Sequence, residues 1–125
     1  MTLQDLRQYP SLKAEIQRLS RRLNELRLEL AEVENEETAK AISSLYIELE
    51  KMHVQQLVKE HEITRRLNQI EDAQVRLSIE MHYIDGATWN EVADAIGGGN
   101  TETSCRKYVS RYLKKLSYKS QESGV

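Results

Sequence analysis

The chain has 125 residues, of which 30% are charged and 39% apolar, and its 18 Lys and Arg against 20 Asp and Glu give a formal charge of −2. Its longest uninterrupted apolar run is three residues, whereas a membrane-spanning helix needs about 20, so the composition argues against membrane insertion. The first residues contain no apolar h-region, so no signal peptide is expected. The single cysteine, Cys105, allows neither an internal disulfide nor a cysteine-based zinc site and suits a reducing cytoplasm.

Glycine and proline are distributed unevenly along the chain. Between Pro10, the one proline, and Gly86 neither residue occurs, which predicts a long helical region from an N-cap at Ser11 to Asp85. Its first part contains apolar residues at alternating spacings of 3 and 4, a heptad pattern typical of associating helices. The members of this row, which we expect to govern oligomerisation, are Ile16, Leu19, Leu23, Leu26, Leu30 and Val33.

A second apolar row begins at Ile42 and continues through Leu45, Leu49 and Met52. Its phase differs from that of the first row, and an acidic stretch separates the two rows. We therefore expect a helical hairpin that turns near residues 34–40, and a single long helix with a stutter is the alternative. The rows can pair within one chain or between chains, and we expect a homo-oligomer, with a dimer favoured.

Three shorter helices are expected after Ile70, because glycines divide the rest of the chain. They cover residues 71–85, 88–96 and 101–116, and the core candidates of the first are Val75, Ile79, Tyr83 and Ile84. Gly86 suits the left-handed position after a helix, and Thr88 forms a capping box with Glu91. Three consecutive glycines end the second helix, and Thr101 caps the third. A short capped helix, a tight turn and a longer helix are typical of a helix-turn-helix.

The last of these helices separates apolar from basic side chains. Its apolar face consists of Cys105, Tyr108, Val109, Tyr112, Leu113 and Leu116. From Thr103 to Gln121 there are six basic and no acidic residues, so this segment carries +6 and the rest of the chain −8. A basic helix face favours contact with phosphate groups, and the alternative is an ordinary solvated surface.

The segment from Tyr83 to Ala93, followed by Ile96 and Gly97, resembles the C-terminal DNA-binding domain, region 4, of bacterial sigma-70 factors. Both have an aromatic-aliphatic-x-Gly turn, a capped helix with a Glu-aliphatic-Ala motif, and an aliphatic-Gly end. The continuation to Lys107 resembles small phage and prophage transcriptional regulators of Firmicutes, and the specific match covers residues 70–116. The turn here is longer than in sigma factors, and the sigma domains that bind core polymerase have no counterpart, so a complete sigma factor is not expected.

The resemblance implies a regulator that binds double-stranded DNA, with host RNA polymerase as a further partner. By correspondence with the family, the DNA-facing positions are Thr103, Ser104, Arg106, Lys107, Ser110 and Arg111. The basic charge farther along the helix adds Lys114 and Lys115. The expected location is the bacterial cytoplasm, at the nucleoid.

No pattern indicates catalysis, a cofactor or a metal site. The three glycines lack the Lys-Ser/Thr of a phosphate loop, and the histidines lack metal-ligand spacing. We therefore predict an all-α, non-enzymatic protein with three parts. They are a hairpin or coiled coil for oligomerisation (1–69), a three-helix unit with the helix-turn-helix (70–118) and a flexible tail (119–125).

Two alternative functions stay open. A phage small terminase subunit also joins a helix-turn-helix to an oligomerisation helix, although usually in the opposite order. A coiled-coil adaptor, such as an anti-sigma or scaffold protein, would not bind DNA at all.

Overall fold

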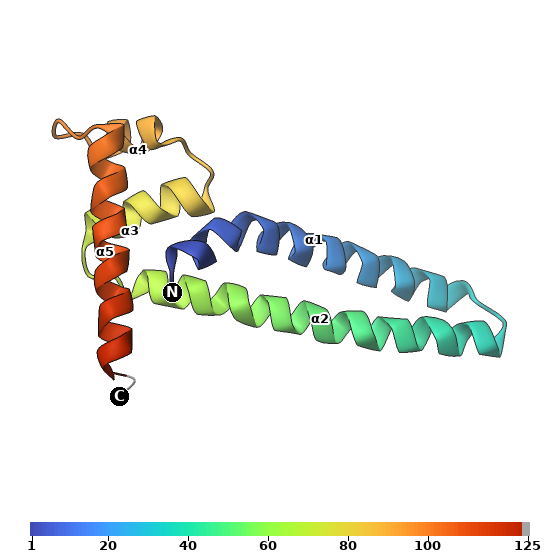
Figure 1. Cartoon of the computed structure of the whole chain (residues 1–125). Helices are drawn as coiled ribbons and strands as arrows, with labels where there is room; N and C mark the ends of the chain where they lie inside the picture. Colours follow the sequence, from blue (N-terminus) through green and yellow to red (C-terminus); the bar gives the residue numbers. More distant parts are fainter. Residues whose placement is uncertain (124–125) are drawn as a thin grey trace. The chain divides into compact units, whose positions relative to one another are not determined.

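The computed structural model describes the backbone of residues 1–123 and the side chains of residues 1–116. The described residues form helices and no strand, which confirms the all-α prediction. The elements, labelled in Figure 1 except for the π-helical η1, are α1 (Leu3–Glu32), α2 (Glu36–Asn68), α3 (Ala73–Ile79), η1 (Glu80–Ile84), α4 (Trp89–Ile96) and α5 (Glu102–Ser123).

The chain divides into two units by its internal contacts. The hairpin unit is Ser11–His61, and the compact unit is Met1–Pro10 together with Glu62–Val125. The compact unit therefore includes the first ten residues and the end of α2, whereas the sequence suggested a boundary between residues 69 and 70. Helix α5 ends at Ser123 and so includes residues 119–123 of the expected tail, while residues 124 and 125 lie outside the described residues.

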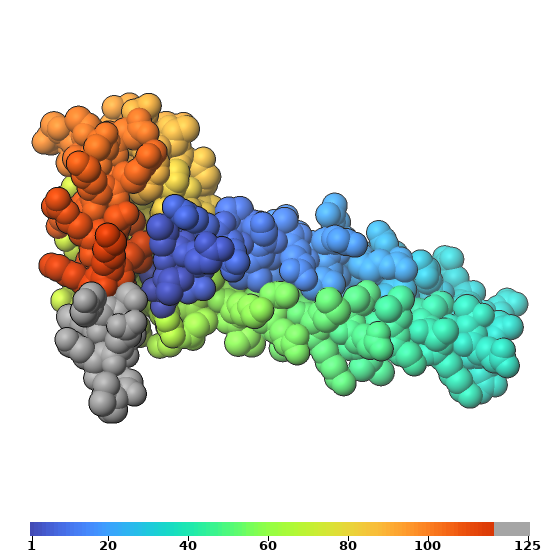
Figure 2. Space-filling model, in the orientation of Figure 1, coloured from blue at the N-terminus to red at the C-terminus, as the bar shows by residue number. Residues whose placement is uncertain are grey.

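The hairpin unit pairs α1 with α2, which excludes one continuous helix. Three residues separate Glu32 from Glu36, and the side chain of Asn35 accepts a hydrogen bond from the amide of Thr38 at 3.1 Å, an N-cap for α2. The two helices lie side by side in Figure 1, and their side chains meet along the hairpin in Figure 2. The turn is shorter than the expected span of residues 34–40.

The first apolar row lies largely buried in this hairpin. Ile16, Leu19, Leu23 and Leu26 are buried, whereas Leu30 is exposed and Val33 half-buried near the turn. Since α2 of the same chain covers four of the six residues, a second copy would have to bind elsewhere or displace α2.

The second apolar row is rotated from the expected position. Leu45 and Met52 are exposed, whereas Ile42, Tyr46, Leu49 and His53 form a half-buried row with the same heptad spacing. In the sequence, both rows satisfy a heptad pattern. Burial in the folded hairpin identifies the row that faces α1, and periodicity alone does not.

The expected start of the first helix at Ser11 is wrong. Helix α1 begins at Leu3, and the amide of Asp5 donates to Oγ1 of Thr2 at 3.2 Å while the Thr2 amide donates to Oδ2 of Asp5 at 2.8 Å. This reciprocal cap satisfies free donors at the helix start. Pro10 lies inside α1, where it lacks the N–H that would bond the carbonyl of Leu6, and the division between the units falls at this residue.

The core of the compact unit joins residues that are distant in sequence. Its buried members are Leu6, Leu67, Ile70, Val75, Ile79, Trp89, Val92, Ala93, Cys105, Val109 and Leu113. Leu6, from the N-terminal segment, is 0% exposed. Burial of this leucine explains why a helix forms before Pro10, because the segment gains apolar contacts that the sequence pattern did not indicate.

The helix expected over residues 71–85 consists of two segments. Asp72 caps α3 by accepting hydrogen bonds from the amides of Gln74 and Val75, and the chain then continues as the π-helical η1. The amide of Asp85 bonds the carbonyl of Glu80, five residues back, at 2.9 Å. The four core candidates are confirmed: Val75 and Ile79 are buried, and Tyr83 and Ile84 pack against the core.

Candidate nucleic-acid interface

Helix α4 is fixed at its start by the predicted N-cap. Oγ1 of Thr88 accepts a hydrogen bond from the amide of Glu91 at 3.2 Å and donates to Oε1 of Glu91 at 3.3 Å. The carboxylate of Glu91 therefore accepts from the hydroxyl, where the capping box predicted the backbone amide of Thr88. Val92 and Ala93 are buried, so this short helix presents one face to the core.

Three glycines form the turn between α4 and α5. Gly97, Gly98 and Gly99 have φ values of +68°, +66° and +79°, a conformation that costs side-chain-bearing residues roughly 1–2 kcal/mol each. Asn100 closes the turn, since its Nδ2 donates to the carbonyl of Gly97 at 2.8 Å. The turn therefore depends on glycine for its backbone path and on one asparagine side chain for its closure.

Thr101 caps α5, as predicted, and uses Ser104 to do so. The amide of Ser104 donates to Oγ1 of Thr101 at 3.2 Å, and the amide of Thr101 donates to Oγ of Ser104 at 2.8 Å. The Ser104 hydroxyl, expected to face DNA, also donates to the carbonyl of Thr101 at 2.9 Å. The O–H group of Ser104 therefore forms part of the N-terminal cap of α5.

The inner face of α5 follows the predicted apolar pattern with one exception. Cys105, Val109 and Leu113 are buried, and Tyr112 and Leu116 pack partly against the core. Tyr108, expected on this face, is 43% exposed. At about 100° per residue it lies at the edge of this face, and its hydroxyl forms a hydrogen bond outside the core.

Tyr108 links α5 to the start of α3. Its hydroxyl donates to Oδ2 of Asp72 at 2.8 Å, across 36 residues of sequence. This hydrogen bond, followed by that from the Val75 amide, lowers the pKa of Asp72, and the same bond raises the pKa of Tyr108. Nothing in the sequence indicated that Tyr108 would form a hydrogen bond with Asp72.

The outer face of α5 carries basic side chains. Lys107, Arg111 and Lys114 are exposed and, at about 100° per residue, lie within an arc of about 60°. Thr103 and Ser110 border this arc on one side, the former exposed and the latter half-buried. None of the three cations forms an ion pair with a described residue.

Arg106 lies on the edge of α5 nearest α4. Its Nη2 is 3.0 Å from Oε1 of Glu102, and its Cζ is 6.0 Å from the ring centroid of Trp89. The side chain is nevertheless 59% exposed. Arg106 is therefore held beside the start of α4 by one carboxylate and one aromatic ring.

Trp89 is itself fixed by aromatic neighbours. Its ring stacks on His82 with centroids 4.0 Å apart and meets Tyr83 edge-on at 6.0 Å. Nδ1 of His82 donates to the carbonyl of Ala87 at 2.8 Å, and burial raises the pKa of Tyr83. Trp89 is buried, and the positioning role of His82 had no indication in the sequence.

The eight expected DNA-contact residues therefore share one helix, but they differ in whether their side chains are free to contact a ligand. Lys107, Arg111, Lys114 and Lys115 extend from exposed positions, whereas Arg106 and Ser104 already have partners. The residues expected for oligomerisation lie on α1 and form no part of this surface.

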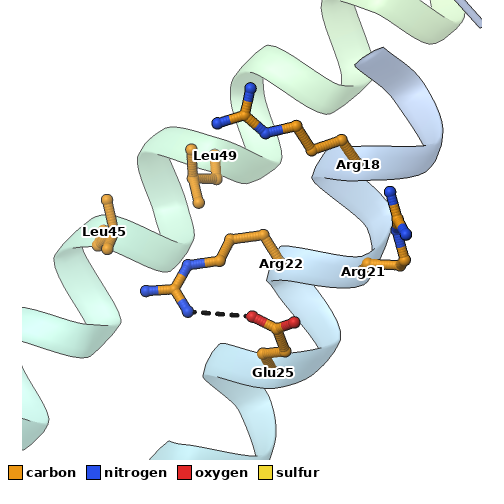
Figure 3. Close-up of a pocket in the computed structure, with 6 residues that line it drawn as sticks. All are labelled: Arg18, Arg21, Arg22, Glu25, Leu45 and Leu49. Carbon is orange, nitrogen blue, oxygen red and sulfur yellow. Dashed lines mark hydrogen bonds and ion pairs between the residues drawn. The ribbon is translucent and has the colours of Figure 1, made fainter. Parts of the chain in front are cut away.

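The hairpin unit carries a separate open groove. Arg18, Arg21, Arg22 and Glu25 of α1 line it together with Leu45 and Leu49 of α2 (Figure 3). Nη1 of Arg22 pairs with Glu25 at 3.1 Å and with Glu29 at 3.6 Å. The groove is therefore basic at its rim and apolar at its α2 side.

Comparison of the chain with protein-family models, with curated proteins and with solved structures finds no match. None of the helices in the described part of the chain has the length and apolar character needed to cross a bilayer.

Proposed function

We propose that the protein binds duplex DNA sequence-specifically through the outer face of α5 and acts as a phage or prophage transcriptional regulator. The observation that carries this proposal is the cluster formed by Lys107, Arg111 and Lys114 on the solvent side of a helix whose other side is buried. The helix follows α4 across a tight turn, the order of elements in a helix-turn-helix.

The electrostatics favour a polyanionic partner. Cations without ion-pair partners can displace the counterions of DNA without first breaking bonds within the protein. Of the two helices α4 and α5, only α5 is basic, because α4 contains the acidic residues Glu91 and Asp94 and no basic residue. Binding would therefore orient α5 toward the phosphates.

Two roles follow from position along α5. Arg106 and Lys107 lie in its first turns, the part of a recognition helix that usually reaches base edges. Lys114 and Lys115 lie farther along and would contact phosphates. To contact a base, Arg106 must break its ion pair with Glu102. An exposed ion pair of this kind is worth only about 0–1 kcal/mol.

The protein would act as a homo-oligomer, with a dimer favoured, in the bacterial cytoplasm at the nucleoid. Two copies set the spacing of DNA half-sites. Host RNA polymerase is a second partner under this proposal.

The first test is the salt dependence of binding to duplex DNA. Lys107→Ala with Arg111→Ala should weaken binding and flatten the slope of log affinity against log salt by about 0.9 for each phosphate that the variant no longer neutralises. The matched control is Arg18→Ala with Arg21→Ala, which removes the same charge from the hairpin unit and should leave the slope unchanged. An equal weakening in both variants would place the DNA-binding surface outside α5.

The second test separates base reading from phosphate binding. Arg106→Ala should cost about 1–3 kcal/mol on a selected site and much less on a scrambled one, while Lys115→Ala should weaken both equally. An equal weakening by Arg106→Ala on the two sequences would contradict its role in base reading. Absence of duplex binding at low salt would favour the adaptor, and a ring of many subunits would favour the terminase subunit.

A further inference from the structure

Among the described side chains, helix α2 exposes more large apolar residues than any other helix. They form two rows on opposite sides of the half-buried row that faces α1. One row is Leu45 and Met52, and the other is Ile47, Val54 and Val58. A helix with apolar side chains on both flanks exposes more apolar surface than one neighbouring helix can cover.

The three-residue row is the more exposed of the two. Ile47, Val54 and Val58 are 55%, 52% and 62% exposed, against 38% and 43% for Leu45 and Met52. The row extends over roughly 16 Å of helix at 1.5 Å per residue. Exposed apolar side chains that share one face of a helix in this way favour an interaction site.

The ends of α2 carry opposite charges. Its first turn contains Glu36 and Glu37, of which Glu36 pairs with Lys40, and its last turn contains Arg65 and Arg66, which both pair with Glu62. About one net negative charge remains at the first end and one net positive charge at the last. Two copies of α2 aligned antiparallel place acidic ends against basic ends, whereas parallel copies place like charges together. The charge distribution therefore favours an antiparallel second copy as the occupant.

The central residues define a register. A two-fold axis between Glu50 and Lys51 sets Glu50 opposite Lys51 of the second copy, and the same operation repeats the pair. In that register Ile47 lies opposite the second copy's Val54, so apolar residues also meet twice. We propose that Ile47 and Val54 form the centre of a two-fold, antiparallel interface with a second copy of the chain, flanked by Val58, which lies opposite Ser43 of the second copy in this register.

The opposite flank of α2 is less suited to a second copy. Its Leu45 borders the groove lined by Arg18, Arg21 and Arg22 (Figure 3). A self-contact there gathers arginines from both chains, and like charges oppose association. The inference locates the interface of the homo-oligomer proposed above and so rests on that part of the proposed function, but it does not depend on DNA binding.

Sedimentation equilibrium of the full chain tests the surface. The unmodified chain should be a dimer, and Val54→Glu with Val58→Glu should raise the dimer dissociation constant by about tenfold or more while circular dichroism keeps its helical signal. Leu45→Glu with Met52→Glu is the matched control and should remain dimeric. A monomeric unmodified chain, or loss of the dimer in the control alone, overturns the proposal.

Disulfide formation tests the direction. Ile47→Cys chains mixed with Val54→Cys chains should oxidise mainly to the mixed disulfide, identified by intact mass. A parallel pair would instead give 47–47 and 54–54 disulfides, and that result overturns the antiparallel register. Cys105 does not compete, since its side chain is 2% exposed.

Discussion

The hairpin unit and the compact unit are both built from amphipathic helices, yet they bury apolar side chains to different extents. In the compact unit Leu6, Ile79 and Val92 are each 0% exposed, whereas in the hairpin unit Leu26 reaches 1%, Leu23 retains 9% and Leu30 retains 36%. Two helices enclose a side chain from one direction, and three or more enclose it from several. Heptad periodicity thus predicts helix pairing but not the depth of burial.

Polar interactions differ in the same way. The hairpin unit has ion pairs between near neighbours in sequence, such as Arg22 with Glu25 and Lys40 with Glu36. The compact unit also has a link between distant helices, from Tyr108 to Asp72. A long-range hydrogen bond fixes the relation of two helices, which a bond within one helix does not.

The largest effect is expected at Leu6. Leu6→Ala should lower the free energy of unfolding of the compact unit by about 2–5 kcal/mol, because it leaves a cavity at a fully buried site. Leu77→Ala is the control, since Leu77 is 43% exposed and should change stability by less than about 0.5 kcal/mol. Denaturant unfolding followed by Trp89 fluorescence measures both. Equal stability of the two variants would show that the N-terminal segment does not belong to this core.

A smaller decrease is expected at Leu26 of the hairpin unit. This side chain is 1% exposed, so Leu26→Ala should cost about 2 kcal/mol, at the lower end of the usual range because a two-helix layer can relax around the gap. Leu30→Ala, on the same row but 36% exposed, is the control and should cost less than half as much. Chemical denaturation followed by circular dichroism reports both values. A destabilisation by Leu26→Ala as large as that by Leu6→Ala would remove the distinction between the units.

The smallest effect is expected at the long-range hydrogen bond and should depend on pH. The bond lowers the pKa of Asp72 below its usual 3.8, so its stabilisation is present above that pH and is lost as pH falls through the lower folded value. The raised pKa of Tyr108 gives stabilisation that is present below pH 10.0 and is lost at higher pH. Tyr108→Phe should therefore lower the melting temperature slightly at neutral pH and not in strong acid.

Tyr112→Phe is the matched control, because it removes a hydroxyl from the same helix. Its melting temperature should follow that of the unmodified protein at every pH. A constant offset for Tyr108→Phe down to strong acid would mean that the Asp72 charge does not contribute.

The starts of helices α4 and α5 could be predicted from residue types alone, whereas α5 continues beyond the expected end at residue 116. Thr88, Thr101 and Gly86 act where they were expected, because caps and left-handed glycines depend on local backbone geometry. The periodicity of α5 likewise predicted that Cys105 and Val109 would be buried. Caps and helix periodicity involve residues only a few positions apart. The types and spacing of those residues are therefore enough to predict them.

Three features required the folded arrangement of the helices: which apolar row of α2 faces α1, the completion by Leu6 of a core formed by residues after Glu62, and the bond from Tyr108 to Asp72. Each depends on how separate helices are rotated and brought together. Helix periodicity restricts that rotation only to within about one residue, or 100°. Burial of a whole side chain, and the pairing of a tyrosine with a distant carboxylate, are settled by the sum of contacts across the assembled helices.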